Sequence, residues 1–372
     1  MGSRPELDPG RCDISRQGAE HLIPVSGDSD HAWSGSCRVL FRLVRHIVSG
    51  SAVVFARGSI SLRLYPHNEL DARGILGELC DQAKLGLSVG FDGIMTSEHH
   101  GGFAGYLPNP LQMTSFLLDE TTSGWVAACP VLLPLRPVAQ LAEEVAWLAV
   151  RHPGRVGLGV AAGALPLDFE AMGMDLADAV PRFKADLPRI VEMLRGRELH
   201  PLEGDRALQE CTQAPIPVLS AAASPAAAQR AAVCGAGILC EGMSDVDRLR
   251  RIIDAYNAAG GDQTKVIIRR VWMGPPPTTL IDRQRGVYDS YADSGTSFAD
   301  DQTISADDPD ELAERIHATW RASGADAVNV RVHLPGVAPS DIRRQIMVLG
   351  NEVIPLVRQM WVEGNALPEP HR

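Results

Sequence analysis

The chain has 372 residues, of which 45% are apolar and 22% are charged. This composition allows one large hydrophobic core or two modest ones, and it excludes a disordered chain or a disulfide-stabilised miniprotein. The formal net charge of −11 excludes a basic footprint for nucleic acid or for an anionic membrane over the whole molecule. We therefore expect a small molecule or a protein as the partner.

The seven cysteines form no C-x-x-C pair. An odd number of unpaired cysteines predicts reduced thiols in a cytoplasmic protein rather than a disulfide framework. No apolar run reaches the roughly 18 residues that a membrane-spanning helix needs.

The first 57 residues differ from the rest in charge and in pattern. They hold seven arginines and six acidic residues, whereas residues 58–372 hold 28 basic and 40 acidic residues. Residues 1–36 lack helical or strand periodicity, which predicts a loose tail, and residues 37–57 carry apolar side chains at the spacing of a short amphipathic helix. A targeting peptide is the alternative, but the four acidic residues among the first 20 oppose it. We expect an N-terminal extension over 1–57 and one domain over 58–372.

From residue 58 onward, short β-rich runs alternate with helical stretches. The predicted strands are Ile60–Tyr65, Gly93–Ser97, Trp125–Leu133, Val156–Ala161, Pro217–Ala221, Gly237–Glu241, Val266–Trp272 and Ala327–His333. Eight strand-helix units with many continuously apolar strands favour a closed parallel (β/α)₈ TIM barrel. An open doubly wound sheet is the alternative, but no G-x-G-x-x-G follows the first strand.

The densest group of chemically active side chains closes the second predicted strand, where Glu98 precedes His99 and His100. In a TIM barrel, function lies at the mouth, the end of the barrel at which the strands finish. An acid and two imidazoles there can bind a metal or move protons. Because adjacent residues of an extended chain point to opposite faces, a helix-based zinc site is excluded, and we expect one imidazole at the mouth and no metal.

The chain resembles the bacterial luciferase-like family of flavin-dependent monooxygenases in an ordered series of segments. These are Gly90–His100, Asn109-Pro110, Pro134–Pro137 with Ala142-Glu143, Gly154–Val160, Ser224-Pro225 with Arg230–Ala232, and Asn351–Pro355. The resemblance covers roughly Ser59 to Arg358. It implies a (β/α)₈ barrel with an insertion after strand seven, here Gly274–Ser305. It also implies reduced FMN, or in one branch a reduced deazaflavin, at the mouth.

The resemblance assigns roles to residues of the second and third strands. His99 would manage protons beside the reactive face of the flavin, and Glu98 would orient it. His100 would adjoin the cofactor, with a buried structural role as the alternative. Cys129-Pro130 falls where the family places a cis peptide against the flavin ring. We predict a cis bond there, because proline lowers the cost of cis to about 0.5–1 kcal/mol.

The phosphate end departs from the family pattern. Ala162 stands where many FMN-binding members have an arginine, and Ala223 and Ala227 replace an acid and a threonine. Ser224 remains as the predicted phosphate contact at a helix start, with a plain N-cap as the alternative. The missing arginine removes a charge-assisted pair worth about 1.5–3 kcal/mol. Weak FMN binding, another anchor and a deazaflavin therefore all stay open.

Five residues that close strands one, seven and eight are predicted to line a substrate pocket: Tyr65, His67, Trp272, Met273 and His333. Core packing explains Trp272 and Met273 equally well. For Tyr65 and His67 the alternative is a loop position without a role.

The resemblance implies an oxidoreductase that uses reduced FMN and O₂ to oxygenate a small organic substrate through a flavin hydroperoxide. A separate flavin reductase would supply the reduced FMN, because no nicotinamide-binding motif is evident, and we expect a homodimer. A deazaflavin-dependent hydride-transfer enzyme of the same fold is one alternative. A non-catalytic flavin-binding partner subunit is the other.

Overall fold

The computed structural model describes residues 52–103, 105–291 and 303–365. The predicted tail and nearly all of the predicted amphipathic helix lie outside the described residues, so they stay predictions. Within the described part of the chain, no helix is both long enough and apolar enough to cross a membrane.

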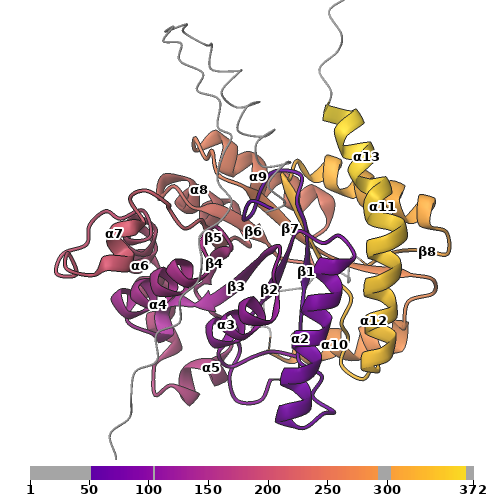
Figure 1. Cartoon of the computed structure of the whole chain (residues 1–372), viewed down its shortest axis with the longest axis horizontal. Helices are drawn as coiled ribbons and strands as arrows, with labels where there is room; N and C mark the ends of the chain where they lie inside the picture. The colour runs from indigo at the N-terminus through magenta and orange to yellow at the C-terminus, as the bar shows by residue number, and fades with distance from the viewer. Residues whose placement is uncertain (1–51, 104, 292–302, 366–372) are drawn as a thin grey trace, which may run out of the picture. The chain divides into compact units, whose positions relative to one another are not determined.

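Eight parallel strands close into a barrel (Figure 1). The strands are β1 (Ile60–Arg63), β2 (Gly93–Thr96), β3 (Trp125–Leu132), β4 (Val156–Ala161), β5 (Val218–Ala221), β6 (Gly237–Cys240), β7 (Lys265–Met273) and β9 (Ala327–Arg331). Each strand pairs with the next, β7 pairs with both β6 and β9, and β9 pairs back to β1. The predicted (β/α)₈ barrel is confirmed.

Helices follow the strands and cover the outside of the barrel (Figure 1). They are α2 (Ala72–Ser88), α3 (Pro110–Glu120), α4 (Val138–Arg151), α5 (Pro166–Ala171), α6 (Ala179–Met193), α7 (Arg206–Glu210), α8 (Pro225–Val233), α9 (Val246–Ala258), α10 (Thr278–Tyr291), α11 (Pro309–Ser323), α12 (Pro339–Val348) and α13 (Ile354–Asn365). Several begin at a side chain that caps the first turn, as Asp71 does for α2 and Asp245 for α9.

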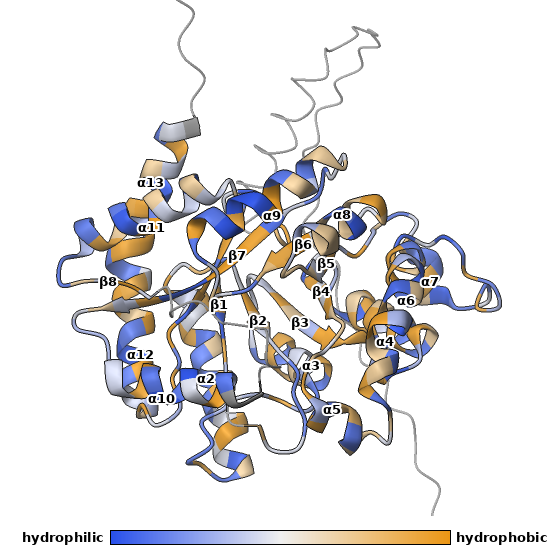
Figure 2. Ribbon diagram, turned by 180° about the vertical axis from the view of Figure 1, so that it is seen from behind, coloured by the Kyte–Doolittle hydropathy of each residue, from blue (hydrophilic) through white to orange (hydrophobic). Residues whose placement is uncertain are grey.

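Two apolar layers lie on the two faces of the strands. The larger layer fills the space between the strands and the helices, and Leu62, Ile94 and Val126 belong to it. The smaller layer lies inside the barrel and includes Met95 and Trp125. Because successive side chains of a strand alternate between faces, one apolar run supplies both layers. Figure 2 shows the apolar colour on the strands and mixed colour on the surrounding helices.

Large rings fill the barrel end opposite the mouth. Phe55 packs edge-on against Trp125, with 5.0 Å between the ring centroids. Glycines make room for these rings, since a Cβ on Gly157 would lie 2.7 Å from Phe55 Cζ and one on Gly93 would overlap the Trp125 ring. The end of the predicted extension therefore packs with the barrel.

Two parts of the C-terminal third carry structure beyond the eight predicted strand-helix units. The insertion after β7 holds α10 and a short strand, β8 (Ile304–Ala306), which pairs with the end of β7. Between α12 and α13 the helical path is interrupted by a π turn over Leu349–Val353. Pro355 explains the interruption, because its ring lacks an N–H and clashes with the carbonyl four residues earlier.

Candidate active site

A buried carboxylate holds the imidazole of His99 at the mouth. Nδ1 of His99 donates to Oδ2 of Asp168 at 2.8 Å, and Oδ1 of Asp168 accepts the backbone N–H of His100 at 2.7 Å. The Asp168 side chain is 1% exposed, whereas that of His99 is 19% exposed. The pair fixes the tautomer and the orientation of the ring, so Nε2 is the nitrogen that remains for a ligand.

A glycine turn brings α5 to His99. Gly101 has a φ of +66°, and a Cβ there would lie 2.6 Å from Cδ2 of Leu167, the residue before Asp168. A side chain at this position would have to displace the side chain of Leu167 in the first turn of α5. Asp168 was not predicted from the sequence, because nothing in the α5 sequence marks it as a partner of β2.

Glu98 serves a different histidine from the one predicted. Its Oε2 accepts the N–H of Leu132 at 2.6 Å, and its Oε1 accepts from Arg136 and, at 3.0 Å, from Nε2 of His100. The prediction that Glu98 orients His99 was therefore wrong, and Asp168 takes that position. The error has a simple cause: adjacent residues in an extended segment face opposite ways, so Glu98 reaches His100, two residues along.

Aromatic side chains surround His99. The Tyr106 ring lies edge-on to the imidazole at 4.3 Å, and the Phe103 ring lies at 5.1 Å. The Tyr106 ring also lies 5.1 Å from the Tyr65 ring, and its hydroxyl oxygen lies 2.7 Å from that of Tyr288. Burial raises the pKa of Tyr106 well above its usual value, which keeps the phenol neutral.

Three buried arginines lie near Tyr65. Arg63 donates to Asn329 Oδ1 at 2.6 Å and to the carbonyl of Cys129 at 2.9 Å. The guanidinium of Arg331 lies 4.9 Å from the centre of the Tyr65 ring, which is a cation-π contact. Burial acts to raise the pKa of Tyr65, but the positive charges of Arg331, Arg63 and Arg270 outweigh it, so the pKa is lowered. The three guanidinium groups therefore place positive charge beside Tyr65.

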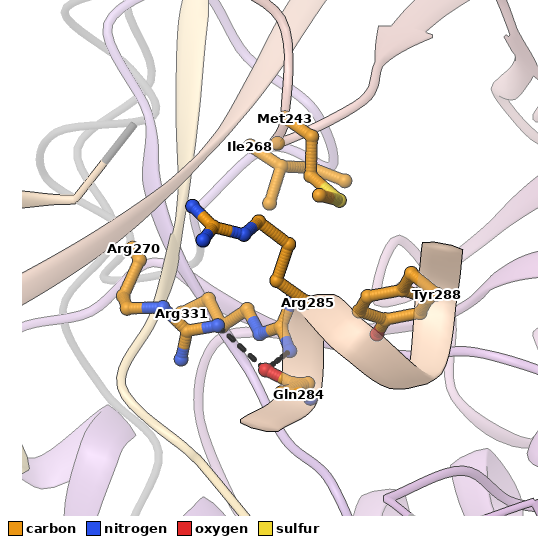
Figure 3. A pocket seen from close by; sticks show the side chains of 8 residues that line it. Met243, Ile268, Arg270, Gln284, Arg285, Tyr288 and Arg331 are labelled. Atoms are coloured by element: carbon orange, nitrogen blue, oxygen red, sulfur yellow. Dashed lines mark hydrogen bonds between the residues drawn. The ribbon is translucent and has the colours of Figure 1, made fainter. Parts of the chain in front are cut away.

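Arg270 and Arg331 share one acceptor. Their Nη2 atoms donate to Oε1 of Gln284 on α10, at 2.7 and 2.6 Å (Figure 3). Arg285 and Tyr288 of the same helix line the small hollow beside them. This group was not predicted from the sequence, since its members come from three separate elements.

Of the residues predicted for the substrate pocket, His333 lies among the arginines. It is 2% exposed, and within the described residues neither ring nitrogen has a hydrogen-bond partner. Burial is the main cause that lowers the pKa of His333 well below its usual value. The nearby His67, Arg331 and Arg270 lower it further, so the ring is neutral. His67 is buried and makes two hydrogen bonds. Its Nδ1 donates to Glu69, and its Nε2 accepts from Gln82.

The other predicted pocket residues pack differently. Tyr65 is buried in the wall between Tyr106 and Arg331. Trp272 lies in the outer apolar layer and Met273 packs against that layer. Both backbone groups of Met273 bond the side-chain amide of Gln345. Neither residue lines the hollow beside Arg270, so substrate contact by them stays a prediction.

Apart from His100, the predicted cofactor residues lie on β3, directly after β4 and at the start of α8. The Cys129-Pro130 bond is cis, as predicted. Burial raises the pKa of the Cys129 thiol to about 12, so it is no nucleophile at neutral pH. Ala162 packs against the outer layer. Ser224 caps α8, accepting the N–H of Ala227 at 3.3 Å.

A cation that was not predicted from the sequence lies beside Ser224. Nη2 of Arg248, on α9, donates to the carbonyl of Ala223 at 2.9 Å and lies 3.6 Å from Glu241. In the part of the chain that the structure describes, no group of three or more His, Cys, Asp or Glu side chains could hold a metal ion.

Comparison with known proteins gives the family. The model of the luciferase-like monooxygenase family matches residues 60–328. The chain belongs to this family.

Two curated relatives differ in the cofactor that their names imply. The oxygenase component of a flavin-dependent trigonelline monooxygenase from Acinetobacter baylyi is 31% identical over 125 residues, which are 33% of this chain and 34% of the relative. An F420-dependent glucose-6-phosphate dehydrogenase from Kineococcus radiotolerans is 24% identical over 76% of this chain and 93% of the relative. The chain spans about half or less of the first curated relatives that it matches.

A solved structure shares the fold of this luciferase-like protein. It is the oxygenating constituent of 3,6-diketocamphane monooxygenase from Pseudomonas putida, in complex with FMN. The TM-score is 0.62 at 20% identity, over 80% of this chain and 98% of that chain.

Proposed function

We propose that this protein is a flavin-dependent monooxygenase that uses reduced FMN and O₂ to place one oxygen atom on a small organic substrate. The observation that carries the proposal is the Asp168–His99 pair, which sets an oriented imidazole at the mouth of a luciferase-like barrel. Histidine is the side chain that most often donates and accepts protons in enzyme sites.

The mouth suits a flavin ring, which has polar atoms along one edge. Among the described residues, Ser97 Oγ and both ring nitrogens of His333 are buried there without a hydrogen-bond partner. A buried polar group without a partner is costly, so these atoms favour a polar ligand that completes their hydrogen bonds. The cis peptide at Cys129-Pro130 would support the ring, and His100 would stay a structural neighbour.

Ser224 and Arg248 would hold the phosphate of FMN. The N-terminus of α8 offers backbone N–H groups and a partial positive charge, and Arg248 brings a full positive charge to the same loop. Arg248 would thereby replace the arginine expected at Ala162. The position of Arg248 supports FMN binding although an alanine stands at position 162.

Bound reduced FMN would supply the electrons that activate O₂. His99 would carry the proton at Nε2, while Asp168 holds Nδ1–H and stabilises the ring when it is positively charged. Phe103 and Tyr106 would exclude water from the reacting atoms.

The proposal includes a separate flavin reductase and a cytoplasmic homodimer. One relative is named as an oxygenase component, which favours a reductase partner. The described cysteines are all free thiols, in keeping with a reducing compartment.

A deazaflavin-dependent hydride transfer is the second candidate, because one relative over most of this chain is named as F420-dependent. It would use the same barrel mouth without O₂.

Titration of the purified protein with FMN and with F420, in both redox states, separates the candidates. We expect FMN to bind with a micromolar dissociation constant, measured by protein fluorescence. We also expect O₂ uptake that depends on the substrate. Preference for F420 without O₂ uptake would favour hydride transfer. Binding of neither cofactor would leave a non-catalytic partner subunit.

A further inference from the structure

A cavity opens at the mouth of the barrel beside the proposed catalytic histidine. Its volume is about 330 Å³, near the lower end of the range for small-molecule sites. Loops that follow three strands, β1, β2 and β9, supply one wall with Asn68, Glu69, Phe103, Pro335 and Gly336. The Phe103 ring also lies 5.1 Å from the His99 ring, so the cavity and this histidine share Phe103 as a neighbour.

One face of α10 forms another wall of the cavity. Its lining residues are Leu280, Arg283, Gln284, Val287 and Tyr288. They recur at intervals of three and four residues, which places them on one side of the helix, and Figure 3 shows two of them, Gln284 and Tyr288, on this helix. The Tyr288 ring lies 6.1 Å from that of Phe103. Two aromatic rings therefore border the cavity, and they favour a ligand with a planar body.

Buried hydrogen bonds fix a carboxylate on the cavity wall. Oε1 of Glu69 accepts from Nδ1 of His67 at 3.0 Å, and Nε2 of His67 accepts from Gln82 at 2.8 Å. A neutral imidazole completes both bonds, so Glu69 is positioned and keeps its negative charge. The His67 side chain is fully buried, whereas that of Glu69 is 42% exposed. The adjacent Asn68 accepts the N–H of Gly105 at 2.7 Å, which ties the loop after β1 to the loop after β2.

A guanidinium group lies on the α10 wall. Arg283 is exposed, and among the described residues its side chain makes no hydrogen bond and no ion pair, with Glu69 or with any other group. The cavity thus presents one negative and one positive group on different walls. Opposite charges at separate places favour a ligand that bears both charges over a ligand that bears only one.

We propose that this cavity binds a small planar zwitterion, with its ammonium group on Glu69 and its carboxylate on Arg283. Compounds of this class would be the substrates of the monooxygenase, so the inference rests on the proposed function. Closure of the cavity by a direct ion pair between Glu69 and Arg283 in solution is the competing arrangement, and the test separates the two.

The experiment uses the full chain and three probes that share a benzene ring, titrated by calorimetry near neutral pH. The zwitterion is para-aminomethylbenzoate. Its analogue para-hydroxymethylbenzoate lacks the positive charge, and para-aminomethylbenzamide lacks the negative charge. We expect each analogue to bind about fivefold more weakly than the zwitterion, because each loses one partly exposed ion pair.

Two variants locate the binding. Glu69→Gln should remove the preference for the zwitterion over the hydroxymethyl analogue and keep its preference over the benzamide. Arg283→Gln should do the reverse. Asp282→Asn is the control, because it removes an exposed negative charge of the same helix that pairs with Arg285 and does not line the cavity. It should keep both preferences.

Equal affinity for the zwitterion and both analogues would overturn the inference and favour the direct ion pair. Retention of both preferences in Glu69→Gln and in Arg283→Gln would also overturn it, as would no binding of the zwitterion at millimolar concentration. Failure of FMN to bind, with both preferences present and each lost in its matching variant, would instead reject only the proposed function.

Discussion

Asp168 and His99 are 69 residues apart in the sequence, yet Oδ2 of Asp168 lies 2.8 Å from Nδ1 of His99. The second oxygen of Asp168 accepts the backbone N–H of the next residue, His100. One buried carboxylate thus fixes both the ring and the chain that carries it. His99 therefore faces the mouth, whereas His100 is held by Glu98.

Asp168→Asn should impair turnover more than folding. The amide keeps the shape but loses the charge that stabilises a protonated imidazole and fixes its tautomer, so we expect substrate-dependent O₂ uptake to fall by about 100-fold or more. Nitrogen NMR of the His99 ring should show loss of the Nδ1–H tautomer. Asp254→Asn, on the exposed face of α9, is the control. An unaltered His99 spectrum would show that Asp168 does not orient the ring.

Glu98→Gln should affect folding first. The substitution leaves the charge of Arg136 without its carboxylate, and hydrogen bonds to charged groups contribute about 1.5–3 kcal/mol each. We expect a loss of that order in the free energy of unfolding, measured in urea. Glu311→Gln, in an exposed ion pair with Arg315, should cost less than about 1 kcal/mol. Equal stability of the two variants would mean that the buried pair contributes nothing.

Gly101→Ala tests the close approach of α5. Positive φ alone costs an alanine about 1–2 kcal/mol, and the contact with Leu167 adds to that cost. Gly102→Ala is a matched control, because Gly102 has a φ of +73° with open space around it. Both variants should lose stability because of the positive φ, and we expect the larger fall in melting temperature for Gly101→Ala and a disturbed His99 spectrum for that variant only. Identical behaviour of the two variants would rule out a role for the close approach.

Arg248→Ala should weaken the binding of FMN and leave the affinity for riboflavin unchanged. If Arg248 holds the phosphate, its loss removes a charge-assisted pair, and we expect about tenfold weaker FMN binding by fluorescence titration. Riboflavin has no phosphate, so its affinity should not change. Arg250→Ala, on the same helix, is the control. A parallel loss for FMN and riboflavin would place Arg248 outside the phosphate site.

Buried thiols should make the protein lose stability in alkali. Burial raises the pKa of Cys240 from its usual value of 9.0 to about 12. Between these values the folded state keeps a proton that the unfolded state has released, so stability is full below about pH 9 and falls as pH rises toward 12. One thiol contributes a slope of up to about 1.4 kcal/mol per pH unit.

Unfolding in urea at several alkaline pH values checks this expectation. Cys240→Ala should reduce the slope of unfolding free energy against pH by the contribution of one thiol, whatever its effect on stability at neutral pH. Cys234→Ala, at a half-buried position, should reduce it less. A slope that Cys240→Ala leaves unaltered would contradict the prediction.

The periodicity of apolar residues was sufficient to predict the barrel. Alternating strands and helices, with capping residues such as Ser224, depend on near neighbours in the chain, and the observed strands begin within one residue of those predicted. Strand ends were less accurate: β1 ends at Arg63 and not at Tyr65, because pairing with both neighbours ends there. The π turn before Pro355 was missed since helical periodicity continues through it.

The sequence by itself determined that eight units form a parallel barrel and that an acid and two histidines close its second strand. Tertiary structure alone decided which side chains meet. Asp168 reaches His99 because the turn at Gly101 admits α5, and Gln284 reaches Arg270 and Arg331 because α10 lies over strands that its own sequence does not specify. Periodicity fixes the face of each element, whereas partners across elements depend on loop path and register, which local sequence does not encode.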